Sequence, residues 1–327
     1  SYAKIVLFGD LVAGDVPDEP YFSHELFSYF PARMQKTYAG EIKRHRLRRE
    51  IIATQIANSL INRGGPTIIS RIAERTGASV SDITRAYAAV RGAFAMQDLH
   101  GGIDALDTKI PGRLQLDMYV TVQDVLTDRI GWFLRNVGFD NGLEKTVSHY
   151  RQSLAALARL LPDLMPPFMA KAAREAEALL AGGKVPAALA RQIAYLPYLA
   201  SAADVVLVAD GSRRKLRDAA TAYYAVAERF QIGRIVAMAR ALETVDYYED
   251  LAVEKACDGL ALAQKRLTES VLSASKGTPD IAGWEKAFGY KVTATAGQID
   301  AMLAEGRATS AKTAVAASLL TELASGG

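Results

Sequence analysis

Apolar residues recur at intervals of three and four positions along almost the whole chain, whereas the alternation typical of strands is nearly absent. This spacing places apolar side chains on one face of a helix, and that face must be buried against other helices. We therefore predict an all-α fold of packed helices with no sheet of consequence. The clearest stripe, in residues 48–62, consists of Ile51, Ile52, Ile56, Leu60 and Ile61.

Composition agrees with a folded helical chain and limits its function. Half of the 327 residues are apolar, 23% are charged and the net charge is +3. These values exclude disordered, collagen-like and disulfide-rich chains. The small positive charge does not by itself indicate a polyanionic partner, so we expect no nucleic acid as a partner.

The single cysteine, Cys257, allows neither a disulfide framework nor a cysteine metal site, which fits a reducing cytoplasm. No uncharged apolar run approaches the roughly 20 residues of a membrane span. The chain starts without a secretory signal, at Ser1 and already inside an apolar run. We expect a cytoplasmic piece of a longer protein that has no membrane partner.

Two blocks of sequence recur in the second half of the chain. Residues 53–57 return 137 positions later as residues 190–194, and six residues between 82 and 94 return 136 positions later. The matches fall mainly on apolar positions, as expected for two helical units that pack in the same way. We predict a duplicated multi-helix module. In this prediction, residues 1–140 contain an N-terminal segment followed by the first copy. Residues 141–277 contain a bridging helix (143–181) followed by the second copy. Residues 278–327 form further helices at the C-terminus.

The four histidines do not form a metal-binding pattern. None has the spacing of a zinc site, and the sequence contains no phosphate-binding glycine loop and no nucleophile motif. We interpret them as unrelated surface or core residues. They are His24, His45, His100 and His149.

Acidic pairs and the lone thiol offer no clearer chemistry. Asp246 with Glu249 and Asp250 has the spacing of a solvated helical face, whereas an acid–base pair needs burial to shift a pKa. Cys257 lies in a helical stripe and is expected to be an inert packed thiol. We predict no catalytic, cofactor-binding or metal-ligating residue in this chain.

Residues 43–49 form a strongly basic run that resembles a phosphate or nucleic-acid patch. Glu41 and Glu50 flank the run, and no aromatic residue interrupts it. We favour ion pairs or an interface over an anion site.

Residues 66–96 fit a helix-turn-helix pattern, with Gly77 in the turn and a capping box formed by Ser79 and Asp82. The first turns of the second helix offer only Asp82 and one arginine, Arg85, and an acid there would repel a duplex. We favour a packing role over a DNA-reading role.

Several stretches together carry a family resemblance, and Leu47–Gln55 is the most specific part of them. The stretches are residues 15–21, 29–31, 45–55, 62–65, 76–77, 85–87, 132–136, 224–226 and 228–230. They resemble the C-terminal region of the large bacterial NAD-specific glutamate dehydrogenases. The resemblance implies a parent enzyme that converts L-glutamate, NAD and water to 2-oxoglutarate, ammonia and NADH. The glutamate-binding and nicotinamide-binding parts of that family precede this region, so no catalytic residue is carried over.

The resemblance implies that this chain is a non-catalytic helical domain with a structural, oligomerisation or regulatory role, inactive alone and with no cofactor of its own. The expected partners are the catalytic domain of the same polypeptide and further copies in a homo-oligomer. Two alternatives remain. One is a helix-turn-helix DNA-binding regulator using residues 66–96, and the other is a free-standing helical adaptor.

Overall fold

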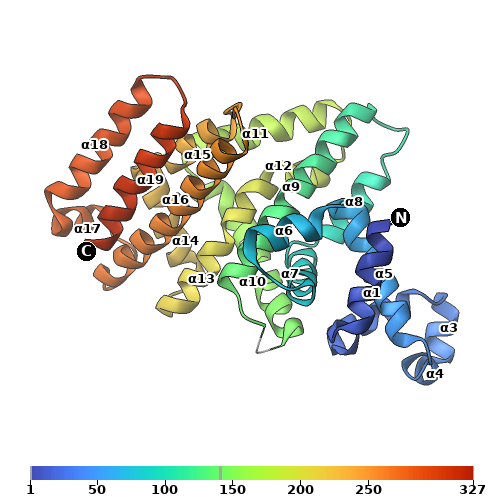
Figure 1. Ribbon diagram of the computed structural model, residues 1–327. Coiled ribbons are helices and arrows are strands. Elements are labelled where there is room, and N and C mark those ends of the chain that lie inside the picture. Colours follow the sequence, from blue (N-terminus) through green and yellow to red (C-terminus); the bar gives the residue numbers. More distant parts are fainter. Residues whose placement is uncertain (1, 140–141, 327) are drawn as a thin grey trace. The chain divides into compact units, whose positions relative to one another are not determined.

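The computed structural model describes residues 2–139 and 142–326. Within these ranges the chain forms nineteen α-helices and two short 3-10 helices, and it contains no strand (Figure 1). The prediction of an all-α fold is therefore confirmed. No single described helix is long and apolar enough to cross a membrane. Among the described helices, the consecutive pair α12 (Ala187–Ser201) and α13 (Ala203–Ser212) would together pass such a test, by length and composition alone.

The chain forms two compact units. Unit 1 comprises residues 1–152 and 179–200, and unit 2 comprises residues 153–178 and 201–327. The division runs through α10 (Leu143–Leu164) and α11 (Pro167–Gly182). The domain boundaries predicted above, at 140 and 277, stay predictions.

Unit 1 is organised around α5 and α7. Helix α5 packs against α1, α2 and α9, and α7 packs against α8 and α9. Three residues of the apolar stripe predicted on α5, Ile52, Ile56 and Leu60, are at most 2% exposed. The other two, Ile51 and Ile61, are half-buried. The elements of this unit are α1 (Tyr2–Ala13), η1 (Val16–Asp18), η2 (Pro20–Phe22), α2 (Ser23–Ser28), α3 (Ala32–Thr37), α4 (Ala39–Lys43), α5 (Arg48–Gly64), α6 (Ile68–Thr76), α7 (Val80–Ala93), α8 (Met96–Asp104), α9 (Gly112–Asn136) and α12 (Ala187–Ser201), with the start of α10 and the end of α11.

Unit 2 is built on the longest helix, α16, which lies alongside α19 and also contacts α13 and α14 (Figure 1). Leu260 and Leu267 of α16 and Leu320 of α19 are fully buried. The helices of this unit are α13 (Ala203–Ser212), α14 (Leu216–Arg229), α15 (Ile232–Arg240), α16 (Tyr247–Ala274), α17 (Ile281–Phe288), α18 (Tyr290–Ala304) and α19 (Ser310–Ser325), with the end of α10 and most of α11.

The bridging segment differs from the prediction of one helix over 143–181. It consists of two helices, α10 and α11, with a break at Met165 and Pro166. Proline lacks the backbone N–H that a helix interior needs and disfavours helical geometry in the preceding residue. Pro167 instead occupies the first position of α11, where no such donor is required.

The backbone repeats with the period found in the sequence. Helices α7 and α14 begin 136 residues apart, at Val80 and Leu216, and both contain 14 residues. Helices α8 and α15 are also 136 residues apart and contain nine residues each. Left-handed residues precede α8 and α15 at Ala95 (φ 50°) and Gln231 (φ 52°). The two copies therefore share turns as well as apolar positions.

Candidate functional site

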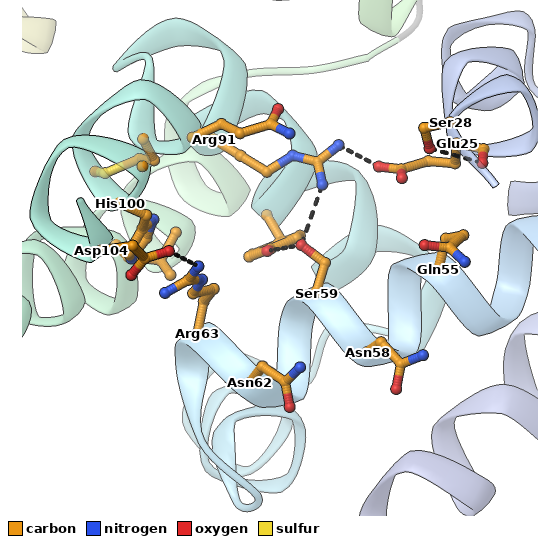
Figure 2. A pocket seen from close by; sticks show the side chains of 15 residues that line it. Glu25, Ser28, Gln55, Asn58, Ser59, Asn62, Arg63, Arg91, His100 and Asp104 are labelled. Carbon is orange, nitrogen blue, oxygen red and sulfur yellow. Dashed lines mark hydrogen bonds and ion pairs between the residues drawn. The ribbon is translucent and has the colours of Figure 1, made fainter. Parts of the chain in front are cut away.

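A polar cavity of about 420 Å³ lies within unit 1, where α2, α5, α7 and α8 converge (Figure 2). Fifteen residues line it, and most of them carry polar or charged side chains. This composition is unusual for the meeting point of four helices, because buried polar groups lose free energy unless they are paired. We therefore take the cavity as the candidate site.

Helix α5 supplies one wall of the cavity through a polar stripe. The stripe residues recur at intervals of three and four, so they share one face of the helix. The buried apolar stripe occupies another face and holds α5 in the bundle. The same sequence pattern thus fixes the helix and presents its polar face to the cavity. The stripe consists of Gln55, Asn58, Ser59, Asn62 and Arg63.

One side of the cavity holds a buried ion pair between Arg91 of α7 and Glu25 of α2. The side chains of Arg91 and Glu25 are only 12% and 9% exposed. Arg91 also donates a hydrogen bond of 3.1 Å to the hydroxyl of Ser59, and its guanidinium lies 5.7 Å from the centre of the Tyr87 ring. These contacts satisfy a charge that would be costly to bury alone.

The surroundings of Glu25 keep it ionised. Burial by itself would raise the pKa of Glu25, but the hydrogen bond from His24 and the charge of Arg91 outweigh burial and lower the pKa to about 2. In turn, the hydrogen bond with Glu25 raises the pKa of His24, against the opposing effect of burial. His24 Nε2 lies 3.2 Å from the Glu25 carboxylate.

A second, more exposed ion pair lies on the other side of Ser59 in Figure 2. Arg63 Nη2 is 3.0 Å from the Asp104 carboxylate, and the two side chains are 35% and 48% exposed. The Tyr119 hydroxyl also donates a hydrogen bond to Asp104. His100 lines the cavity beside this pair, and burial together with the charge of Arg63 lowers its pKa, which favours the neutral ring.

The four histidines are not gathered into one cluster. His24 and His100 lie at the two ion pairs, His45 packs against Phe30, and His149 packs against Tyr150. Over residues 2–139 and 142–326, no group of three His, Cys, Asp or Glu side chains is placed to hold a metal ion.

The basic run engages in ion pairs, as favoured from the sequence. Arg48 and Arg49 both pair with Asp18 at the end of η1. Arg49 also donates hydrogen bonds of 2.8 and 2.7 Å to the carbonyl oxygens of Val12 and Gly14. This part of the run therefore joins the start of α5 to the N-terminal elements of unit 1.

Helices α6 and α7 are joined by a short turn, as the pattern predicts, with Gly77 in the left-handed region at φ 70°. The N-cap half of the predicted capping box is present, because the Ser79 hydroxyl accepts a 3.1 Å hydrogen bond from the Asp82 backbone N–H. The Asp82 carboxylate accepts a 2.7 Å hydrogen bond from the Ser79 hydroxyl. Arg85 contacts three carboxylates, at 2.6, 2.5 and 3.3 Å, and its side chain is only 16% exposed. Its donors hold η1 and its neighbours to α7 instead of facing a groove. The three carboxylates belong to Asp15, Glu19 and Asp82.

The acidic residues Asp246 and Glu249 make hydrogen bonds at the start of α16, and Cys257 lies within the same helix. Asp246 caps α16 by accepting hydrogen bonds from the backbone N–H groups of Tyr248 and Glu249. The Glu249 carboxylate accepts a 2.9 Å hydrogen bond from the Ser310 hydroxyl. Cys257 is half-buried within α16.

Comparison with known proteins identifies the family. A family model described as "Glutamate dehydrogenase, C-terminal" matches residues 1–322. The chain belongs to the glutamate dehydrogenase C-terminal family. The resemblance inferred from the sequence is thereby confirmed.

Three relatives of this chain are described as NAD-specific glutamate dehydrogenases. The protein of Halomonas elongata is 34% identical over 86% of the chain, and that of Pseudomonas aeruginosa is 30% identical over 86%. The Mycobacterium tuberculosis protein is 26% identical over 97%. The chain spans 17%, 17% and 20% of the length of these relatives.

Two of the sequence stretches that carry the family resemblance contribute residues to the cavity. Gln55 ends the most specific stretch, and Asn62 and Arg63 begin another. Sequence reasoning did not identify the cavity, because a polar stripe beside an apolar one is typical of any solvated helix face. The signal that was available is the run of five polar residues at helical spacing within residues 55–63.

Proposed function

We propose that this chain is the C-terminal helical domain of an NAD-specific glutamate dehydrogenase and that its role there is structural. It packs against the catalytic domain of the same polypeptide, forms contacts between copies in a homo-oligomer, or conveys regulation. The observation that carries the proposal is the family match over residues 1–322, together with relatives that bear this name and are about five times as long.

The whole enzyme would oxidise L-glutamate with NAD and water to 2-oxoglutarate, ammonia and NADH. We propose that the nicotinamide cofactor binds to another part of the polypeptide. A dinucleotide site of the usual kind presents backbone amides at the ends of parallel strands, and residues 2–139 and 142–326 contain no strand. In the cavity, the guanidinium group of Arg91 is held in a buried ion pair with Glu25. We propose that the reaction takes place on other parts of the polypeptide. We also propose that the chain is located in the cytoplasm.

The contacts of the candidate DNA-reading helix support the structural role over the regulator. A recognition helix needs cationic side chains that are available to phosphates and bases. Arg85, the arginine in the first turns of α7, is instead held by three carboxylates of unit 1.

A deletion in a relative tests the structural role. The region that matches this chain is removed from the Halomonas elongata enzyme, and a second version carries this chain in its place. We expect the deletion to impair assembly, measured by sedimentation, and NADH formation from glutamate and NAD. The version that carries this chain should regain both. If the deletion leaves assembly and turnover unchanged, the structural role is contradicted.

A further inference from the structure

The polar character of the cavity is not repeated in the sequence of the second copy. With the offset of 137 that aligns residues 53–57 with 190–194, three residues of the α5 stripe correspond to apolar residues of α12. Ser59, Asn62 and Arg63 correspond to Leu196, Leu199 and Ala200.

The buried charge on α7 is likewise absent from the second copy. With the offset of 136 that aligns α7 with α14, Arg91 corresponds to Ala227, which is 1% exposed. Replacing a buried ion pair by apolar residues is often neutral or stabilising, so packing alone does not explain why the first copy keeps its charges. We infer that binding of a ligand explains why the first copy retains these charged residues.

The arrangement of charge in the cavity restricts the chemistry of that ligand. Arg91 with Glu25 and Arg63 with Asp104 contribute two positive and two negative charges, and Figure 2 shows them on either side of Ser59. Because these formal charges cancel, the cavity has no net attraction for a simple anion or a simple cation. A molecule that carries both signs can form charge-assisted hydrogen bonds with both kinds of side chain.

The second ion pair has the exposure that a ligand-binding group needs. Arg63 and Asp104 are 35% and 48% exposed, so they can exchange their mutual contact for contacts with a ligand. The Arg91–Glu25 pair is buried and stays as a fixed wall. Asn58 and Asn62 also line the cavity and carry amide donors and acceptors. The volume of about 420 Å³ is that of a small-molecule site.

We propose that this cavity binds a small zwitterion, a free α-amino acid. The guanidinium of Arg63 binds the carboxylate of the ligand, the carboxylate of Asp104 binds its ammonium group, and the amides of the α5 stripe contact its side chain. The proposal does not rest on the assignment to glutamate dehydrogenase, because it concerns binding by this chain alone.

Calorimetry on the full 327-residue chain tests the proposal, with the common L-amino acids as probes. Each amino acid that binds is compared with two analogues of the same side chain, one without the amino group and one without the carboxylate. We expect at least one amino acid to bind with a stoichiometry of one, and both analogues to bind at least about tenfold more weakly, a difference of about 1.4 kcal/mol. Absence of any binding tighter than a Kd of about 1 mM overturns the proposal. An analogue without the amino group that binds as tightly as its amino acid also overturns it, because the cavity would then be an anion site.

Variants locate the binding site. Arg63→Ala introduces the residue type that the second copy has at this position, and we expect it to bind at least about tenfold more weakly. Asn62→Ala removes an exposed amide of the stripe and should also weaken binding. The matched control is Arg113→Ala on α9, which removes an 85% exposed arginine that pairs with Asp117 outside the cavity, and its affinity should equal that of the original chain.

Circular dichroism checks the folding of each variant. If Arg63→Ala is misfolded, Asn62→Ala decides the location of the site. Unchanged affinity in folded cavity variants places the ligand elsewhere and overturns the proposal.

Discussion

Glu25 and Arg91 are 66 residues apart in sequence, yet they form an ion pair in which each side chain keeps only about a tenth of its surface exposed. This pair joins α2 to α7 and closes one side of the cavity. A buried charge of this kind is tolerated because its partner and the surrounding hydrogen bonds replace water.

Removing one partner should therefore be costly. We expect Glu25→Gln to lower the free energy of unfolding by about 3 kcal/mol at neutral pH, because it leaves the buried guanidinium of Arg91 uncompensated. Urea denaturation of the full chain measures the change. The control is Asp117→Asn, which removes a 52% exposed carboxylate paired with Arg113 and should cost at most about 0.5 kcal/mol. Equal effects of the two variants would contradict the importance of the buried pair.

The same pair predicts an acid dependence of stability. The pKa of Glu25 falls from 4.5 to about 2 on folding, so its ionised form contributes stability that is complete above pH 4.5 and is lost as the pH falls towards 2. The shift corresponds to about 3 kcal/mol. The difference in unfolding free energy between the original chain and Glu25→Gln should shrink from about pH 5 to about pH 2. A difference that stays constant over this interval would refute the assignment.

The duplicated core predicts matching effects at two tyrosines. Tyr87 and Tyr223 are each 2% exposed and lie at the same position of α7 and α14. We expect Tyr87→Ala and Tyr223→Ala each to cost about 3 kcal/mol or more in chemical unfolding, as truncation of a buried aromatic does. Tyr290→Ala is the control, because Tyr290 is 84% exposed, and it should be nearly neutral. Near-neutral effects at both buried tyrosines would undo the inference of a shared packing scheme.

The left-handed turns before α8 and α15 predict a gain of stability. Ala95 and Gln231 have φ values of 50° and 52°, which strain a residue with a Cβ atom but not glycine. We expect Ala95→Gly and Gln231→Gly each to raise the thermal midpoint, through a gain of about 0.5 to 1 kcal/mol. Ala188→Gly, at an exposed position of α12, should have the opposite sign and cost about 1 kcal/mol. A loss of stability in both turn variants would show that these turns are not strained.

The contacts of Arg85 predict a negative result with DNA. Because three carboxylates hold this side chain, we expect no binding of random duplex DNA that weakens steeply with salt. Arg85→Ala should lower the thermal midpoint and leave the result of the shift assay unchanged. Salt-dependent binding that disappears in Arg85→Ala would support the DNA-binding regulator instead.

The helical fold follows from local sequence patterns, whereas the cavity depends on pairings between distant residues. The apolar stripe of α5 and the N-cap at Ser79 follow from local spacings in the sequence, and both appear in the structure. The contact of Glu25 with Arg91 has no local signature, because each residue alone resembles any charged residue on a helix. The break at Pro166 had a local signal, and expecting one bridging helix gave that signal too little weight.

The central claim is that these helices have a structural role and that glutamate is oxidised on another part of the polypeptide. The decisive measurement is NADH formation by the purified chain in the presence of L-glutamate and NAD. We expect no formation of NADH under conditions in which the Pseudomonas aeruginosa relative is active. Steady production of NADH by the chain alone, at rates comparable to those of that relative, would contradict it.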